Sequence, residues 1–158
     1  MVLPEVSRLI IQVFVMARAH SSYSFDPNGF SIWRCDFKYN SELTQTFMSS
    51  NQIGGFFNRL EASRKYLFGS MGVLGVAGDS VISGVLLARG PEIKPVVDVA
   101  PDWESYNFRS LDVKGNEDDK KFFEAALAWD LEIDGKKWVD GKNVSWVFSK
   151  TKSFALTA

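Results

Sequence analysis

The chain has 158 residues, with 18 lysines and arginines against 19 aspartates and glutamates, so its formal net charge is −1. This balance excludes a nucleic-acid binder held by bulk positive charge, and 46% hydrophobic with 23% charged residues excludes a disordered or coiled-coil chain. The length predicts one domain with enough core to fold without disulfides, and the single cysteine, Cys35, fits a reducing compartment.

The N-terminal region contains an apolar segment, residues 9–17, that follows Arg8 and has the form of the hydrophobic part of a secretory signal. Glu5 offsets the charge of Arg8 and Gln12 interrupts the run, which favours a short helix or strand of the domain instead. No apolar run in the chain reaches the ~18 residues that a membrane crossing needs. The single histidine, His20, excludes multi-histidine metal sites.

Residues 30–39 alternate between apolar and polar side chains, with Cys35 on one face and Arg34 on the other. A period of two with aromatic residues predicts a half-buried strand. Asn40-Ser41 is a turn signal, so residues 43–48 are expected to return as the antiparallel partner of this strand.

A helical period follows, carried by Ile53, Phe57, Leu60 and Arg64. Candidate caps at its start are Ser49, Ser50 and Asn51. Each glycine of Gly54-Gly55 costs about 1 kcal/mol in a helix, which predicts that a neighbouring sheet approaches closely there.

Two buried strands are predicted for residues 66–76 and 81–88, joined by a turn, and residues 91–105 read as a long ordered loop. A short strand is expected at 106–109, and Asn116 is expected to cap a helix whose apolar stripe contains Phe123. Strands and helices in this order do not repeat as βα units. We therefore expect an α+β fold, a mostly antiparallel sheet with helices packed on it in a single domain.

Motifs for catalysis are absent from the pattern. Gly72, Gly75 and Gly78 lack both the lysine of a phosphate-binding loop and the spacing of a dinucleotide fingerprint. Those within the strand, Gly72 and Gly75, are expected to mark close packing or a bulge. Cys35 is expected to be a small buried hydrophobe. Asp98, Asp102 and Glu104 could form a paired-carboxylate site, but solvated charge is the favoured reading. We expect no catalytic residue, cofactor or metal.

Two features suit binding to a partner. The first is the loop around Asp102, Trp103, Glu104 and Tyr106, whose aromatics either anchor a protein partner or, as we favour, cap the core. The second is the basic group Arg59, Arg64 and Lys65, which either forms a solvated helix face, the favoured reading, or contacts phosphates.

Several runs of the sequence resemble the C-terminal domain of translation elongation factor 1-gamma, in a fungal-like form. They occur in order from about Gly29 to Lys142: residues 31–33, 36–40, 42–49, 54–60, 83–85, 89–90 and 98–106. On this basis residues 25–142 are identified as the family-like domain, residues 1–24 as an atypical N-terminal segment, and residues 143–158 as an atypical C-terminal tail.

The resemblance implies a non-catalytic, cytoplasmic scaffold or anchor within the complex that recharges elongation factor 1-alpha with GTP. Its implied partners are the other subunits of that complex. Binding to a membrane is not expected. Family members normally carry a glutathione-transferase-like domain that makes the main assembly contact, and the resemblance does not include that domain here. The alternative is an RNA- or ribosome-associated binding module that uses the small basic patch and nearby aromatics.

Overall fold

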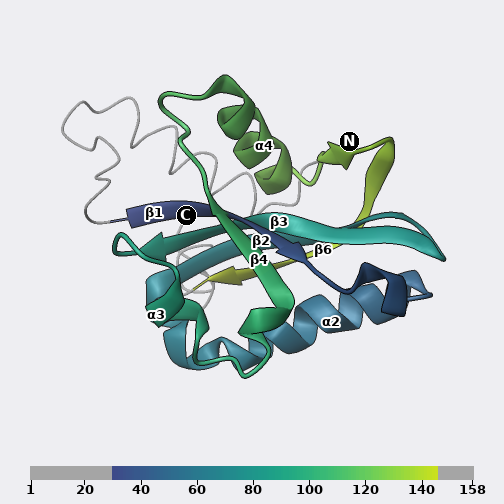
Figure 1. Ribbon diagram of the computed structural model, residues 1–158, viewed down its shortest axis with the longest axis horizontal. Coiled ribbons are helices and arrows are strands. Elements are labelled where there is room, and N and C mark those ends of the chain that lie inside the picture. The colour runs from purple at the N-terminus through teal and green to yellow at the C-terminus, as the bar shows by residue number, and fades with distance from the viewer. Residues whose placement is uncertain (1–29, 146–158) are drawn as a thin grey trace, which may run out of the picture.

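Residues 30–145 are described by the computed structural model, so the apolar segment 9–17 and His20 lie outside the described residues. Within them, six strands form one antiparallel sheet in the order β4-β1-β3-β2-β6-β5 (Figure 1). The strands are β1 Phe30–Phe37, β2 Leu67–Val76, β3 Asp79–Arg89, β4 Tyr106–Ser110, β5 Glu132–Ile133 and β6 Lys136–Ser145. The α-helices are α2 Thr46–Arg59, α3 Lys94–Val97 and α4 Glu117–Leu127, and the 3-10 helices are η2 Asn40–Glu42, η3 Glu61–Tyr66 and η4 Trp103–Ser105. This architecture confirms the predicted α+β class.

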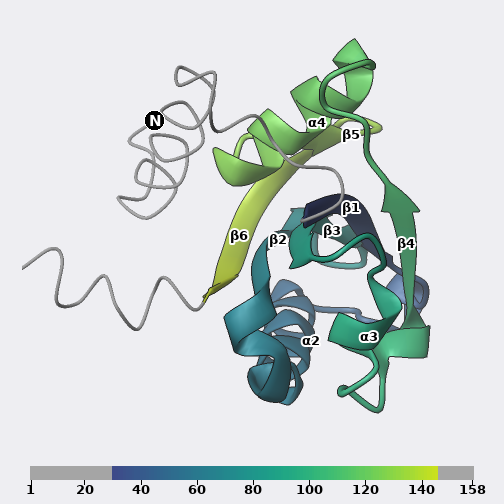
Figure 2. The same ribbon diagram turned by 90° about the vertical axis from the view of Figure 1, so that its left-hand side faces the viewer.

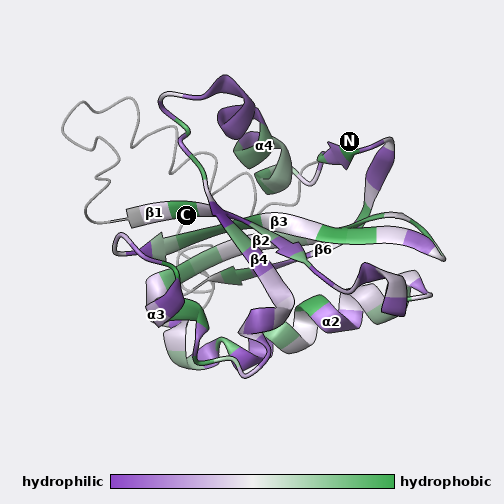
Figure 3. Ribbon diagram, in the orientation of Figure 1, coloured by the Kyte–Doolittle hydropathy of each residue, from purple (hydrophilic) through white to green (hydrophobic). Residues whose placement is uncertain are grey.

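Helices cover both faces of the sheet. The helices α2 and α3 lie on one face and α4 lies on the other (Figure 2). Each face has its own core: one contains Ile53, Phe56 and Met71, and the other contains Phe123 and Leu127. Figure 3 shows α4 changing from hydrophilic at its start to hydrophobic near the sheet, as expected for a helix that meets the sheet with its later turns.

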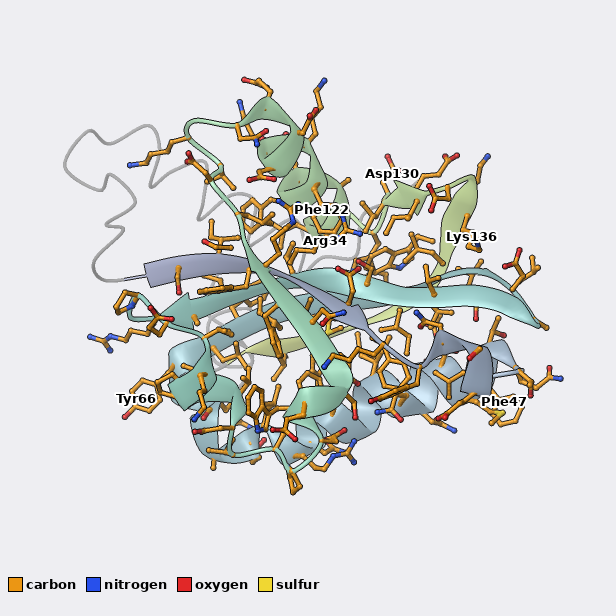
Figure 4. All side chains as sticks on the ribbon, viewed as in Figure 1. Arg34, Phe47, Tyr66, Phe122, Asp130 and Lys136 are labelled. Atoms are coloured by element: carbon orange, nitrogen blue, oxygen red, sulfur yellow. The ribbon has the colours of Figure 1, made fainter. Side chains whose placement is uncertain are left out.

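The first strand forms where its alternation predicts, but both of its faces are covered. Cys35 faces the α2 core, while Ile32, on the opposite face, is also buried. On that face the Arg34 guanidinium lies 4.4 Å from the centre of the Phe122 ring of α4 (Figure 4). The polar face of β1, which was expected to meet solvent, is therefore covered by α4, a helix from much later in the chain.

The predicted hairpin between β1 and residues 43–48 is wrong, because β1 pairs with β3 and β4 instead. The chain turns through η2, and α2 begins at Thr46, before the predicted caps. Ser49 and Ser50 are buried within the helix, where the Ser50 hydroxyl donates to Asp140 of β6 at 2.5 Å. Burial of this face against the sheet overrides the weak strand preference of the Thr-rich segment.

The two glycines of α2 make room for different neighbours. A Cβ on Gly54 would lie 3.2 Å from Lys142 Cε in β6, which confirms the predicted approach of the sheet. A Cβ on Gly55 would instead lie 2.8 Å from Nη1 of Arg59, in the same helix. The helix ends at Arg59, so the prediction that it continues to Arg64 is wrong.

The central hairpin of β2 and β3 forms as predicted, with the pairing Val76↔Asp79 closing a turn at Ala77-Gly78. The strand glycines mark close packing, as expected. A Cβ on Gly72 would collide with the indole of Trp138 in β6, and Gly78 has a φ of 78° in the turn.

The C-terminal half contains two strands, β5 and β6, that the sequence pattern does not reveal. Asn116 caps α4 as predicted, its side chain accepting from the backbone N–H groups of Asp118 and Asp119. The expected loop at 91–105 is ordered by α3 and η4. No strand was expected after residue 127, yet β6 pairs along β2 as far as Ser145. The boundary proposed at Lys142 therefore falls inside a strand.

Candidate partner-binding groove

Two of the sequence-predicted binding features meet in one ion pair. Arg59, at the end of α2, donates from Nε to Asp102 Oδ1 at 2.8 Å and from Nη2 to Oδ2 at 2.6 Å. This two-pronged geometry is the strong form of an arginine–carboxylate contact. The hydrogen bonds from Arg59 to Asp102 raise the pKa of the guanidinium further above its ordinary value. The pair fixes the loop before β4 against the end of α2.

Tyr106 belongs to the core and not to the surface. Its side chain is 2% exposed, and its ring packs against Phe37 with centroids 5.1 Å apart. Its hydroxyl accepts a hydrogen bond from Gln52 Nε2 at 3.2 Å, and burial raises its pKa. Of the two readings of this loop, the structure places Tyr106 as a cap on the core.

The neighbouring loop residues are more exposed. Trp103 is half-buried against the core, and Lys94 Nζ lies 5.8 Å from the centre of its ring. Glu104 is exposed. The carboxylates expected as a possible pair are instead neutralised separately, since Asp98 pairs with Lys94 at 3.7 Å and Asp102 pairs with Arg59.

The two arginines of the predicted basic group pair with different carboxylates. Arg64 lies in η3 and pairs with Glu61 at 2.8 Å, while Arg59 pairs with Asp102. Lys65 follows Arg64 in η3. Both arginines of the predicted basic patch are thus partnered by carboxylates, which reduces the positive charge available to a phosphate backbone.

A groove with a volume of ≈480 Å³ opens beside the Arg59–Asp102 pair. It is lined by Phe37, Tyr39, Glu42, Gln52, Arg59, Asp102 and Ser105. The end of β1, η2, α2 and the loop through η4 all contribute to this lining. Backbone bonds hold its walls together, with the N–H of Lys38 donating to the carbonyl of Ser105 at 2.9 Å.

Five groove residues are not among the sequence-predicted site residues: Phe37, Tyr39, Glu42, Gln52 and Ser105. The alternation of residues 30–39 predicts Tyr39 on the apolar face of the strand, whereas it lies beyond the end of β1 with 47% of its surface exposed. Its position after the last apolar alternation, next to the Asn40-Ser41 turn, is the signal that could have marked it. Phe47 and Tyr66 are also exposed, at the two ends of the α2 layer (Figure 4).

Other kinds of site find little support among residues 30–145. No group of three or more histidine, cysteine, aspartate or glutamate side chains is arranged there to hold a metal ion. Cys35 is fully buried, and burial raises the pKa of its thiol. Within the same range, no helix has both the length and the apolar character that crossing a membrane requires.

Comparisons with known proteins give the family. Residues 16–92 match the family described as "Elongation factor 1 gamma, conserved domain". The chain is 50% identical over 119 residues to elongation factor 1-gamma of Schizosaccharomyces pombe and 48% identical over 122 residues to elongation factor 1-gamma 1 of Saccharomyces cerevisiae. Identity to elongation factor 1-gamma 2 of rice is 40% over 120 residues. Each alignment covers 75% of this chain but only 28–29% of the relative. The chain therefore spans less than a third of these relatives, and it belongs to the elongation factor 1-gamma family through that family's conserved domain.

Proposed function

We propose that this domain is a non-catalytic interaction module of translation elongation, acting in the cytoplasm as a scaffold or anchor for other subunits of the elongation factor 1 complex. In this proposal the groove beside Arg59 and Asp102 is the partner-binding surface, and the adjacent Trp103 and Glu104 form its rim. The names of the relatives support the link to elongation, and the groove supports a role in binding.

The observation that carries the proposal is the way the groove is built. Two polar side chains of its lining bond to other residues of the protein, Arg59 to Asp102 and Gln52 to Tyr106. Side chains that are hydrogen-bonded within the protein stabilise the walls of the groove. They are poorly suited to transferring protons to a substrate. The buried thiol of Cys35, with its raised pKa, is equally unsuited to act as a nucleophile.

The test is a quantitative pull-down with the tagged full chain from a fission-yeast cytosolic extract. Enrichment of elongation factor 1 subunits, measured by mass spectrometry against a tag-only control, is the expected result. Arg59→Glu should reduce that enrichment, because it places two carboxylates against each other at the groove. The charge swap that combines Arg59→Glu with Asp102→Arg should recover part of it.

The matched control is Glu132→Lys, a charge change on β5 at the opposite end of the sheet, which should leave capture unchanged. A folded chain that enriches no subunit would contradict the proposal. Capture that depends on RNA, lost on nuclease treatment and steeply weakened by salt, would favour the RNA-associated alternative predicted from Arg59, Arg64 and Lys65.

A further inference from the structure

We propose that the groove recognises a lysine or arginine side chain of a partner polypeptide, with Tyr39 and Glu42 as the recognising residues. This inference rests on the proposed function, because it names the kind of partner that the same groove takes. It follows from the charges of the groove, from its exposed ring, and from an equivalent arrangement elsewhere in the chain.

The groove has an excess of negative charge. Its lining contains the carboxylates of Glu42 and Asp102 and the guanidinium of Arg59. Arg59 and Asp102 neutralise each other through two hydrogen bonds. The carboxylate of Glu42 is exposed and forms no ion pair among the described residues. The charge left for a ligand is therefore negative, and its complement is a cation.

The aromatic wall suits the same ligand. Tyr39 is 47% exposed, and its ring meets Phe37 edge-on, with centroids 5.9 Å apart and planes at 84°. A cation within about 6 Å of the face of such a ring is attracted by the π electrons. Tyr39 and Glu42 belong to one turn, since the N–H of Glu42 donates to the carbonyl of Tyr39 at 3.0 Å. The Tyr39 ring and the Glu42 carboxylate can therefore contact the same cation.

The turn that carries them is anchored to the sheet. The side chain of Asn40 donates to the carbonyl of Phe37 at 2.9 Å and accepts from the N–H of Ile82 in β3 at 3.0 Å. Both bonds hold η2 in place before any ligand arrives. A surface that is ordered in advance binds with a smaller loss of conformational entropy.

The chain already holds one of its own cations in this way. The guanidinium of Arg34 lies 4.4 Å from the centre of the Phe122 ring and pairs with Asp36 at 2.7 Å (Figure 4). Tyr39 and Glu42 supply the same two partners, a ring and a carboxylate, without a cation of the described chain between them. An anionic ligand is disfavoured at this place, because it would have to displace Asp102 from Arg59.

The test is an NMR titration of the isotopically labelled full chain with blocked tripeptides. The probes are acetyl-Gly-Lys-Gly-amide and acetyl-Gly-Arg-Gly-amide, compared with the same peptides carrying Gln or Glu at the centre. We expect the cationic probes to cause saturable shifts at the amides of Tyr39, Glu42 and Gln52, with a millimolar Kd. The Gln and Glu probes should cause no saturable shift there.

Variants locate the site. Glu42→Gln and Tyr39→Leu should each raise the Kd of the cationic probes by about twofold to fivefold. This is the range expected for one exposed cation–π contact or ion pair. Glu132→Gln on β5 is the matched control and should change nothing. Near-UV circular dichroism of each variant shows whether the fold is retained.

Several outcomes overturn the inference: equal affinity in Glu42→Gln, shifts spread evenly over every exposed carboxylate, or saturable shifts of the groove amides by inorganic phosphate. The pull-down separates this inference from the proposed function. Equal capture of elongation factor subunits by the folded native chain and Glu42→Gln would leave the function standing and remove the inference. Binding of the cationic peptides without capture of any subunit would support the inference and contradict the proposed function.

Discussion

The ring of Tyr106 stacks on the ring of Phe56, with centroids 4.0 Å apart and planes inclined by 18°. Tyr106 begins the edge strand β4 and Phe56 lies near the C-terminal end of α2, so the stack ties the helix to the edge of the sheet. Both side chains are buried. The loop that carries Asp102 is thereby fixed next to the end of the helix that carries Arg59. Packing in the core therefore positions two walls of the groove.

Truncating Phe57 should destabilise the domain strongly. Its side chain is 6% exposed and belongs to the core between α2 and the sheet. Phe57→Ala should lower the free energy of unfolding by about 3–5 kcal/mol, measured by urea titration. Phe47→Ala is the control on the same helix, because Phe47 is 64% exposed, and it should change stability by less than about 0.5 kcal/mol. Similar losses in both variants would contradict this packing of α2.

The Arg59–Asp102 pair should show a measurable coupling that depends on Gly55. A double-mutant cycle of Arg59→Ala and Asp102→Ala should give a coupling free energy of about 0.5–1 kcal/mol for this partly exposed pair. In a Gly55→Ala background the coupling should fall toward zero, because the new methyl group would lie 2.8 Å from Nη1 of Arg59. The guanidinium must then move away from its two-pronged contact.

Gly54→Ala serves as the matched background for that cycle. Its new methyl group would meet only the flexible end of Lys142, on the side of α2 that faces β6. The coupling between Arg59 and Asp102 should be unchanged in this background. An undiminished coupling in the Gly55→Ala chain would show that Arg59 reaches Asp102 by another route.

Stability should fall as the pH rises above about 9. Burial raises the pKa of Cys35 above 9.0 and that of Tyr106 above 10.0. In this range the unfolded chain releases protons that the folded chain retains, so the free energy of unfolding decreases with pH, by up to about 1.4 kcal/mol per pH unit for each group. Urea titrations at pH 7.5 and 10.5 measure the slope. Cys35→Ala and Tyr106→Phe should each flatten it, and an unchanged slope in the double variant would assign the effect to other groups.

Local signals in the sequence predicted much of the fold. The cap at Asn116 and the turn at Gly78 act over a few residues, so their sequence patterns suffice to place α4 and the β2–β3 hairpin. Residues 43–48 have a strand-like pattern, but residues 46–48 form the first turn of α2, a helix whose buried face begins only at Ser49 and Ser50. The strand β6 itself was missed because Lys136, Asp140 and other polar residues interrupt its apolar pattern.

The groove was only half visible in the sequence for a related reason. The sequence marks both Asp102 and Arg59 as candidates, but as parts of separate features, because 43 positions separate them. Their meeting depends on the stacking of Tyr106 on Phe56, which is a tertiary contact. No sequence motif marks Glu42, because a single carboxylate forms none. Only the fold shows that it shares a surface with Tyr39.

Substitution of Gly72 should distort the sheet. A Cβ at this position would collide with the indole of Trp138, which is itself stacked on Trp129 with centroids 6.0 Å apart. Since neither the ring nor the strand can easily yield, Gly72→Ala should lower the free energy of unfolding by about 1–3 kcal/mol. Gly54→Ala should instead be neutral or stabilising by up to about 1 kcal/mol, as expected for a helical glycine facing a mobile lysine. Equal effects of the two substitutions in thermal melts would contradict this reading of the strand glycines.

The end of β6 should be part of the stable domain. Asn143 and Val144 pair with Ser70 and Gly69 of β2, and Val144 is 7% exposed in the core. A chain ending at Lys142 should therefore be less stable than one ending at Ser145 by at least about 1.5 kcal/mol, the value of burying one valine side chain. Because the two chains differ by three residues, urea titration of both isolates their contribution.

A substitution within the full chain separates the valine from the strand pairing. Val144→Ala should be destabilising by about 1–2 kcal/mol, since it removes two buried methyl groups. Val139→Ala on the same strand is the control, because Val139 is 54% exposed and its loss should have little effect on stability. If the chains ending at Lys142 and Ser145 were equally stable, residues 143–145 would be dispensable and the domain would end where the family resemblance ends. A loss that matches Val144→Ala alone would instead show that side-chain burial, and not the last strand pairs, holds this end of β6 in place.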